Sequence, residues 1–253
     1  MEKKILEIRN LTKGFGKRGG YESRVIKGIN MDVYSGDFIA VMGPSGAGKT
    51  TLLNLLSTID KPDGGSIILD REDLVKTGNR RLSEIRRDKI GFIFQEYNLL
   101  DNMSLEDNIA LPLSLNGVKS REVEMRVRKM ANMFGLGEHL KKYPYQLSGG
   151  QKQRGASARA LVTEPEILFA DEPTGALDSR SSRELLISLK NANDSGRATI
   201  LMVTHDAYAA SYAKQVYFLA DGQIQCRLVR KEDRKEFYEK ILDLQISMGG
   251  ERE

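Results

Sequence analysis

A glycine-rich loop at residues 43–50, with the sequence GPSGAGKT, constrains the fold of this chain more than any other feature. It matches the phosphate-binding pattern G-x-x-x-x-G-K-[ST] at every fixed position. The apolar run at residues 38–42 leads into the loop like a buried strand, and leucines at 52, 53, 55 and 56 follow it with the spacing of a buried helix. Because the pattern requires a strand, a turn and a helix in this order, we expect a nucleotide to bind here.

Each part of the loop has a physical role in holding phosphate. Glycines let the backbone curl so that successive N–H groups point at one anion, and the following helix adds the positive end of its dipole. Lys49 would reach the outer phosphates, and the Thr50 hydroxyl would hold Mg²⁺. The alternative is a glycine-rich turn with an ordinary lysine. The predicted nucleotide-binding residues of this segment are Gly43, Pro44, Ser45, Gly46, Ala47, Gly48, Lys49, Thr50 and Thr51.

Length and charge limit the other classes of function. A chain of 253 residues is long for one domain and short for two, which favours a single domain with a large insertion. The net charge is only +4, and the basic clusters at residues 80–81 and 86–89 are interleaved with Glu84 and Asp88. We therefore expect a solvated face there and no nucleic-acid partner.

Cysteine use and hydropathy indicate a chain that works in a reducing compartment. Cys226 is the only cysteine, so the chain can form neither an internal disulfide nor a cysteine-based metal cluster. Residues 1–6 run into alternating polar and apolar positions without the apolar core of a signal peptide. No stretch approaches the roughly 18 consecutive apolar residues that a membrane helix needs. A role at a membrane must therefore come through a partner.

Three further apolar runs end at polar residues with catalytic chemistry. Residues 90–94 end at Gln95, residues 167–170 end at Asp171 and Glu172, and residues 199–204 end at His205. In an open parallel sheet, ligands bind outside the carboxyl ends of the strands, so we expect these residues to share one site with the phosphate loop.

The acidic pair suggests hydrolysis rather than binding alone. Asp171 is the expected second anchor for magnesium beside Thr50, and Glu172 could orient or deprotonate the water that attacks the γ-phosphorus. The alternative is a polar strand end capped by a turn. Gln95 and His205 are weak indications by themselves, and they gain meaning only as members of the set.

A second anion-binding helix start occurs at residues 147–151, with the sequence LSGGQ. Ser148 and Gln151 match a capping box, which opens a helix that runs toward Pro165. Because Gly149 and Gly150 weaken the first turn, they suggest bare N–H groups that a phosphate approaches closely.

These motifs together resemble the ATP-binding cassette (ABC) family over nearly the whole chain. The matching segments are 43–50 (Walker A), Gln95 (Q-loop), 147–151 (signature), 167–172 (Walker B with the catalytic glutamate), 175–178 (D-loop) and His205 (switch histidine). The resemblance implies an α/β fold, namely a P-loop NTPase core with a mostly parallel sheet flanked by helices, an N-terminal antiparallel β layer and an inserted helical subdomain. It also implies ATP hydrolysis with Mg²⁺.

The resemblance assigns roles to individual residues. It implies that Glu172, His205, Gln95 and Lys49 are catalytic, that Thr50, Gln95 and Asp171 hold the metal, and that Ser148, Gly149, Gly150 and Gln151 bind the ATP of a second copy of the chain. Two positions depart from the family pattern: Phe15, or alternatively Tyr21, stands where a tyrosine usually stacks on adenine, and Gly175 opens the D-loop where serine is frequent.

Within the family, the chain is similar to the macrolide-export, lipoprotein-release and cell-division cassettes. Residues 92–101 and 202–212 look most like the bacitracin-type peptide-resistance cassettes. The family resemblance implies an ATP-dependent homodimer on the inner face of the cell membrane. The bacitracin-type likeness implies a large permease partner, detection or removal of antimicrobial peptides, and often a companion sensor kinase. The alternatives are a mechanotransmitter of the other cassette types in this branch and, more remotely, a DNA-repair ATPase, although such ATPases carry coiled coils, zinc-binding cysteines or tandem cassettes. A small-molecule kinase would leave residues 147–151 without a purpose.

The pattern of elements divides the chain into three parts. We expect a nucleotide-binding core at about 1–95 and 166–230, a helical signature subdomain at about 96–165, and a helical tail at about 231–253. Residues 97–113 are the candidate for docking the permease, with a solvent-facing helix as the alternative. Residues 216–224 predict a hairpin with a tight turn at Asp221 and Gly222. The amphipathic helix predicted at residues 233–248 either packs on the chain's own core or makes a dimer or regulatory contact.

Overall fold

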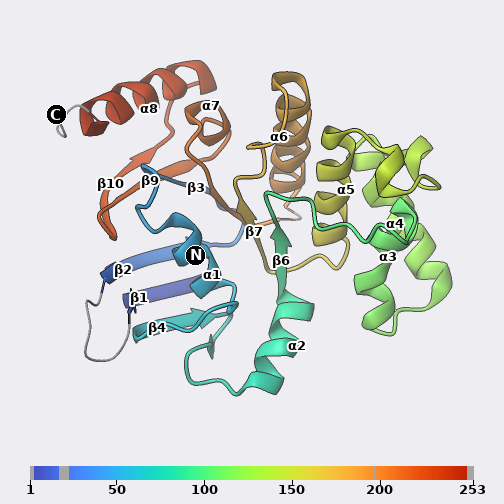
Figure 1. Cartoon of the computed structure of the whole chain (residues 1–253), viewed down its shortest axis with the longest axis horizontal. Helices are drawn as coiled ribbons and strands as arrows, with labels where there is room; N and C mark the ends of the chain where they lie inside the picture. The colour runs from blue at the N-terminus through green and yellow to red at the C-terminus, as the bar shows by residue number, and fades with distance from the viewer. Residues whose placement is uncertain (1–2, 17–22, 197, 250–253) are drawn as a thin grey trace.

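The computed structural model describes residues 3–16, 23–196 and 198–249. Figure 1 shows two β-sheets close to each other, a block of helices at one side, and a C-terminal helix near α7 at the other. This is the α/β architecture that the sequence predicts. None of the helices in the described ranges is long and apolar enough to cross a membrane.

The larger sheet has six strands in the order β10-β9-β3-β8-β7-β6. The five strands from β9 to β6 are parallel, whereas β10 is antiparallel to β9. The strands are β3 (Phe38–Met42), β6 (Ile90–Ile93), β7 (Ile167–Asp171), β8 (Ile200–Val203), β9 (Gln215–Ala220) and β10 (Gln223–Val229). Because the parallel strands end at one edge, the residues that follow β3, β6, β7 and β8 meet there, as predicted.

The ends of three strands differ slightly from the predicted runs. β6 stops at Ile93 and β8 covers only residues 200–203, so both are shorter than their apolar runs. β7 is longer, because Asp171 continues the ladder opposite Val203. Asp171 is thus the last residue of the strand, and the turn begins at Glu172.

The smaller sheet is antiparallel, as predicted for the layer before the phosphate loop. Its order is β2-β1-β4-β5. Its strands are β1 (Lys4–Phe15), β2 (Ser23–Tyr34), β4 (Gly64–Leu69) and β5 (Glu72–Asp73). Alternate residues of β2, including Ile29, Met31 and Val33, are buried, which is the pattern of a strand with one face in the core.

The helices lie on two faces of the larger sheet. They are α1 (Lys49–Leu56), α2 (Asn79–Lys89), α3 (Leu105–Leu115), α4 (Ser120–Met133), α5 (Gly149–Leu161), α6 (Ser179–Asp194), α7 (Ala207–Ala210) and α8 (Arg234–Gly249), with short 3₁₀ helices η1 (Gly137–His139) and η2 (Pro144–Gln146). α3 is amphipathic rather than fully solvent-facing, since Leu105, Ile109 and Leu113 are buried.

Two hydrophobic cores form because successive side chains of each strand point to opposite faces of the larger sheet. Phe38, Ala40 and Met42 of β3 belong to a core with α3 to α8. Ile39 and Val41 belong to the other core, which contains α1, α2 and the antiparallel sheet. The phosphate loop therefore begins at the end of a strand that is buried on both sides.

The C-terminal part contains the predicted hairpin and helix. Asp221 and Gly222 connect β9 to β10 with φ angles of 50° and 78°, as a primed turn requires. The amide of Lys27 in β2 donates to the Gly222 carbonyl oxygen at 2.8 Å, so this hairpin also joins the two sheets. α8 packs on the chain's own core through Phe237 and Ile241, which are 1% and 0% exposed.

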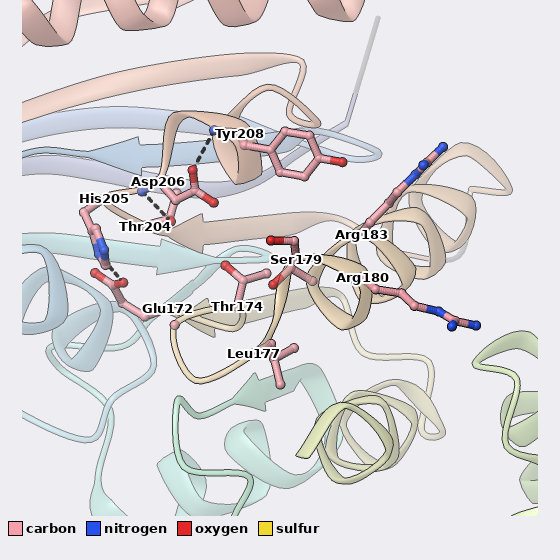
Figure 2. Close-up of a pocket in the computed structure, with 12 residues that line it drawn as sticks. Glu172, Thr174, Leu177, Ser179, Arg180, Arg183, Thr204, His205, Asp206 and Tyr208 are labelled. Carbon is pink, nitrogen blue, oxygen red and sulfur yellow. Dashed lines mark hydrogen bonds and ion pairs between the residues drawn. The ribbon is translucent and has the colours of Figure 1, made fainter. Parts of the chain in front are cut away.

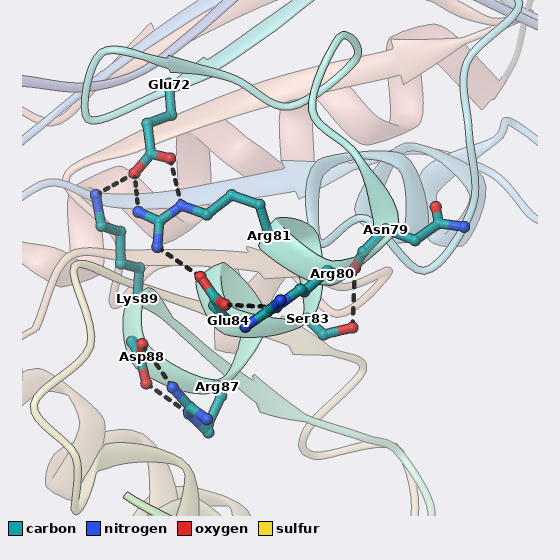
Figure 3. Close-up of polar contacts among 9 residues, drawn as sticks. All are labelled: Glu72, Asn79, Arg80, Arg81, Ser83, Glu84, Arg87, Asp88 and Lys89. Atoms are coloured by element: carbon teal, nitrogen blue, oxygen red, sulfur yellow. Dashed lines mark hydrogen bonds and ion pairs between the residues drawn. The ribbon is translucent and has the colours of Figure 1, made fainter.

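The basic cluster on α2 is neutralised by acidic neighbours, as its interleaved sequence predicts. Figure 3 shows Glu72 between Arg81 and Lys89. Arg81 Nη2 lies 2.8 Å and Lys89 Nζ lies 2.9 Å from Glu72 Oε1. These ion pairs connect α2 to the edge of the antiparallel sheet.

Candidate nucleotide-binding site

The lysine of the phosphate loop is buried and held by the loop itself. Lys49 is 8% exposed, and its Nζ donates to the carbonyl oxygens of Gly43 at 2.9 Å and Pro44 at 3.0 Å. Burial lowers the pKa of Lys49, while the negative charges of Glu172 and Asp171 act in the opposite direction. The ammonium group therefore lies inside the loop and faces two carboxylates.

Two glycines of the loop are required by the surrounding backbone. A Cβ atom on Gly43 would lie 2.0 Å from the Leu219 carbonyl oxygen of β9. Gly48 has a φ of 99°, and its Cβ would meet Ile26 and Val25 at 3.0–3.1 Å. Only glycine tolerates both the positive φ and the close approach.

A cavity of about 300 Å³ opens at the start of α1. Its lining residues are Val25, Ser45, Gly46, Gly48, Lys49, Thr50, Thr51 and Glu172. Five of the predicted loop residues after Pro44, together with Thr51 beyond the loop, thus meet Glu172 around one space. Gly43 and Pro44 line a second cavity of about 400 Å³ on the side of α8, and Ala47 is buried.

Val25 was not among the residues predicted from the sequence. It lies near the start of β2, and only the packing of the antiparallel sheet against the phosphate loop brings it to the cavity. Its sole signal in the sequence is one apolar position in an alternating strand, which many other residues share.

Thr50 and Asp171 meet at the end of β7, as predicted. Thr50 Oγ1 donates to Asp171 Oδ1 at 3.3 Å. Burial raises the pKa of Asp171, and the charge of Glu172 raises it further, whereas the Thr50 hydrogen bond and Lys49 lower it. A nearby divalent cation would favour the charged form of this carboxyl group.

The donor set at Thr50 and Asp171 fits magnesium. A hydroxyl and a carboxylate are hard oxygen ligands, and Mg²⁺ usually takes one or two protein groups plus phosphate oxygens and water. The described residues contain no group of three or more histidine, cysteine or acidic side chains that could hold a metal alone. The pair therefore suits a cation that arrives with a nucleotide.

Glu172 and His205 form the closest polar contact of the site. Figure 2 shows the two side chains pointing toward each other, with His205 Nδ1 2.5 Å from Glu172 Oε2. The Glu172 side chain is only 16% exposed, whereas that of His205 is 65% exposed. Glu172 adopts a φ of 46°, which is unusual for a residue with a side chain. A strained backbone conformation of this kind persists only where the surrounding structure holds it, and such residues cluster at functional sites.

Loops on both sides of this pair enclose a larger cavity of about 770 Å³. Asp206 caps α7 by accepting a hydrogen bond from the Tyr208 amide at 2.8 Å, which fixes the turn after His205. On the opposite side the cavity is lined by Gly175 and Leu177 of the segment resembling the D-loop, and by residues at the start of α6. The cavity therefore extends from Glu172 and His205 toward the start of α6 (Figure 2).

Gln95 follows β6 and lies near the D-loop. A Cβ on Gly175 would be 3.3 Å from Gln95 Nε2, which is a tight contact. This proximity gives a local reason for glycine at position 175. Gln95 is exposed at the common edge of the sheet, and within the described residues it makes no hydrogen bond with Thr50 or Asp171.

The signature helix begins with the predicted capping box. Ser148 Oγ accepts from the Gln151 amide at 3.3 Å, and Gln151 Oε1 accepts from the Ser148 amide at 2.9 Å. The two glycines have a packing role that the sequence did not reveal. A Cβ on Gly150 would lie 2.5 Å from Ser181 Oγ, and one on Gly149 would lie 2.9 Å from the Tyr97 hydroxyl.

The structure does not bring the signature to the phosphate loop of the same chain. None of the residues 148–151 lines the cavity at Lys49. In Figure 1, α5 lies beyond β6 and β7, on the side away from α1. The chain thus has two helix starts suited to phosphate, and they face different places.

Phe15 lies at the last position of β1. It is 49% exposed and pairs with Ser23, two residues before the cavity-lining Val25. The Lys13 ammonium lies 5.1 Å from the centre of its ring. Tyr21, the alternative adenine contact, lies outside the described residues.

Comparison with known proteins gives a consistent result. The model of the family described as ABC transporter matches residues 26–175. The bacitracin export ATP-binding protein BceA of Halalkalibacterium halodurans is 46% identical over 247 residues, which are 97% of each chain. The macrolide export ATP-binding/permease protein MacB of Marinobacter nauticus is 40% identical over 220 residues, which are 87% of this chain and 34% of that protein.

Solved structures with the same backbone include the ATP-binding cassette MJ0796, as a dimer in a post-hydrolysis state bound to ADP and Pi. It aligns with a TM-score of 0.82 and 35% identity, over 90% of this chain and 100% of that chain. The sequence matches and the structural match thus agree with the family that the motifs resemble.

Proposed function

Because this chain belongs to the ABC transporter family, we propose that it is the subunit that couples ATP hydrolysis to a permease for antimicrobial peptides. Membership itself makes the chain an ATP-binding ATPase subunit of a transporter, since its relatives are cassettes of this kind and MJ0796 was captured after hydrolysis. We propose, beyond this membership, the roles of individual residues, the geometry of the reaction and the peptide substrate.

Glu172 is the proposed base for the attacking water. Its side chain lines the same cavity as Lys49 and Thr50, and the contact with His205 Nδ1 fixes its orientation. Glu172 takes a proton from water while the water oxygen bonds to the γ-phosphorus. The bond from that phosphorus to the bridging oxygen breaks, and its electron pair leaves with ADP.

The phosphate loop binds and orients the triphosphate in this scheme. Lys49 exchanges its contacts with the loop carbonyls for the outer phosphate oxygens, and the N–H groups at the start of α1 hold the rest. Thr50 and Asp171 would hold Mg²⁺, with Gln95 as a further ligand, and the ion would neutralise charge on the phosphates. Phe15 would stack on adenine, as its exposed ring at the end of β1 allows.

The separation of the signature from the phosphate loop is the observation that carries the dimeric mechanism. Ser148, Gly149, Gly150 and Gln151 form a capped helix start, and in the described part of the chain none of them lines the cavity at Lys49. In a symmetric pair, each signature can complete the site of the other copy, so that ATP joins two subunits. The dimeric state of MJ0796 supports this arrangement.

The chain is 46% identical to a bacitracin export ATP-binding protein over 97% of its length, which supports an antimicrobial peptide as the substrate of the transporter. The subunit would then act on the cytoplasmic face of the membrane, held there by its permease. Residues 97–113 are the proposed docking segment, because they follow Gln95 closely and include most of α3. The companion sensor kinase stays a prediction from the family resemblance. A macrolide-export role is the second candidate, since MacB cassettes match at 40%.

Replacement of Glu172 by glutamine tests the mechanism. Glu172→Gln removes the base but keeps the size of the side chain, so we expect ATPase activity to fall by at least about 100-fold while ATP traps a dimer. Activity is measured by phosphate release, and association by light scattering after gel filtration with ATP. Lys49→Ala is the matched control, which should lose ATP binding and therefore the dimer as well.

Two results would count against the proposal. Wild-type turnover in Glu172→Gln would show that Glu172 is not the base. A Glu172→Gln chain that stays monomeric in saturating ATP would refute the ATP-driven dimer. Deletion of the gene then tests the substrate, because increased sensitivity to bacitracin with unchanged macrolide sensitivity supports the peptide role.

A further inference from the structure

His139, one of only two histidines in the chain, has no role in the site described above. It ends the short helix η1, before the signature. Its Nε2 lies 3.1 Å from Nε2 of Gln151. The imidazole is half-buried, and its Nδ1 is buried without a hydrogen-bond partner among the described residues.

The capping box fixes the direction of this hydrogen bond. Gln151 Oε1 already accepts from the Ser148 amide at 2.9 Å, so the NH₂ group of Gln151 faces the histidine. An NH₂ group can only donate, and His139 Nε2 must therefore be the acceptor. This places the proton of the neutral imidazole on Nδ1.

We propose that neutral His139 is a positioning residue for the signature. By accepting from Gln151, it holds the carboxamide whose oxygen caps the Ser148 amide, and so keeps the start of α5 in shape for a phosphate. Since the inference rests on the proposed function, a defect at His139 should appear in the ATP-driven association of two copies. Binding of ATP to the phosphate loop of a single chain should not change.

The charged groups around His139 leave it free to accept in this way. It lines a groove of about 660 Å³ together with Glu106 of α3, Arg128 of α4, and Glu138 and Lys141 on its own segment. Glu106 and Lys141 form an ion pair with each other. On α5, His139 faces the uncharged Gln151.

Protonation of His139 would disturb the cap. A charged imidazole donates from both nitrogens, so Nε2–H would point at the NH₂ group of Gln151. A rotated carboxamide would satisfy His139 but turn its NH₂ group toward the Ser148 amide. ATP-driven association should therefore weaken when His139 is protonated.

The test uses the full chain carrying Glu172→Gln, so that the dimer persists. In this background we expect His139→Ala to weaken ATP-driven dimerisation about tenfold, the size expected for loss of one helix cap or hydrogen bond. His139→Gln offers a carbonyl oxygen as the acceptor and should restore dimerisation to within about twofold of the parent. Sedimentation measures association, and a fluorescent ATP analogue measures binding to the single chain.

The pH profile separates positioning from simple packing. On acidification, the parent should lose more dimer affinity than His139→Gln, although both retain His205. Glu138→Ala, which alters an exposed neighbour in the same groove, is the matched control and should behave as the parent.

A double-mutant cycle with Gln151→Ala completes the test. If His139 acts through Gln151, the double variant should be no weaker than Gln151→Ala alone. Parent-like dimerisation of His139→Ala, failure of His139→Gln to restore it, or full additivity in the cycle would overturn the inference. Absence of an ATP-dependent dimer in the parent itself would instead refute the proposed function.

Discussion

At the scale of single residues, Gly43 depends on a distant part of the chain. Its position against the Leu219 carbonyl oxygen leaves no room for a methyl group, because the opposing atom belongs to the backbone and cannot rotate away. Gly117 also has a positive φ, of 69°, but its added Cβ would have no atom within 4 Å. A comparison of the two positions thus separates the free-energy cost of a strained backbone from that of a steric clash.

We expect Gly43→Ala to lower the free energy of unfolding by about 3 kcal/mol or more, because either β9 or the loop must move. Gly117→Ala should cost only about 1–2 kcal/mol from the left-handed backbone. Urea unfolding without nucleotide measures both. Equal losses in the two variants would contradict the steric argument.

The sequence predicted the residues whose role follows from their local pattern. The phosphate loop and the capping box at Ser148 are each contained in fewer than ten consecutive residues, so strand, turn and helix signals suffice. The contact between Glu172 and His205 depends on the pairing of β7 with β8, and sequence order alone could only suggest it. Val25 and the packing role of Gly150 were missed, since both arise from elements far apart in the chain.

At the scale of elements, ion pairs hold α2 against the antiparallel sheet. Arg81 and Lys89 flank Glu72, and their hydrogen bonds lower the pKa of Glu72 to about 2 from its ordinary 4.5. A depressed carboxyl pKa means that the folded state prefers the charged form. The resulting stabilisation is complete above about pH 4.5 and disappears as the pH falls toward 2.

Glu72→Gln should therefore reduce the free energy of unfolding at pH 7 by about 0.5–1 kcal/mol, a value limited by solvent screening of these partly exposed ion pairs. The difference from wild type should shrink as the pH approaches 2. Denaturant unfolding at several pH values measures it. Glu124→Gln, which alters an exposed pair within α4, is the control and should change stability less. A difference that does not vary with pH would contradict the ionic origin.

Element boundaries were predicted less well than element types. The apolar runs located four parallel strands, but pairing within the sheet decided whether Asp171 or Phe94 belonged to a strand. The tail helix was predicted from its spacing, whereas its packing on the core through Phe237 became clear only from the structure. Hydropathy gives the apolar face of a helix but not the surface that covers it.

At the scale of the whole molecule, the distance between the signature and the phosphate loop makes the dimer testable by cross-linking. In a Cys226→Ser, Glu172→Gln background, a chain carrying both Ser45→Cys and Ser148→Cys should form a disulfide between two copies when ATP is present. Non-reducing electrophoresis detects the linked dimer. The physical reason is that only a second copy can bring position 148 to the loop.

Each single-cysteine chain is a control and should give much less linked dimer. A disulfide within one chain, visible as a monomer of altered mobility, would contradict the proposed arrangement. Equal cross-linking with and without ATP would show that the nucleotide does not drive the association.

The packing of Gly43 against Leu219 also determines when the phosphate loop can reach its folded conformation during synthesis. The ribosome completes residues 43–50 long before it reaches β9, which pairs with β3 and supplies the Leu219 carbonyl beside the loop. A nascent chain therefore displays the whole phosphate-binding sequence for most of translation without the support that shapes it. Affinity for ATP should emerge only when the last quarter of the polypeptide has left the exit tunnel, so unfinished chains would not compete for nucleotide.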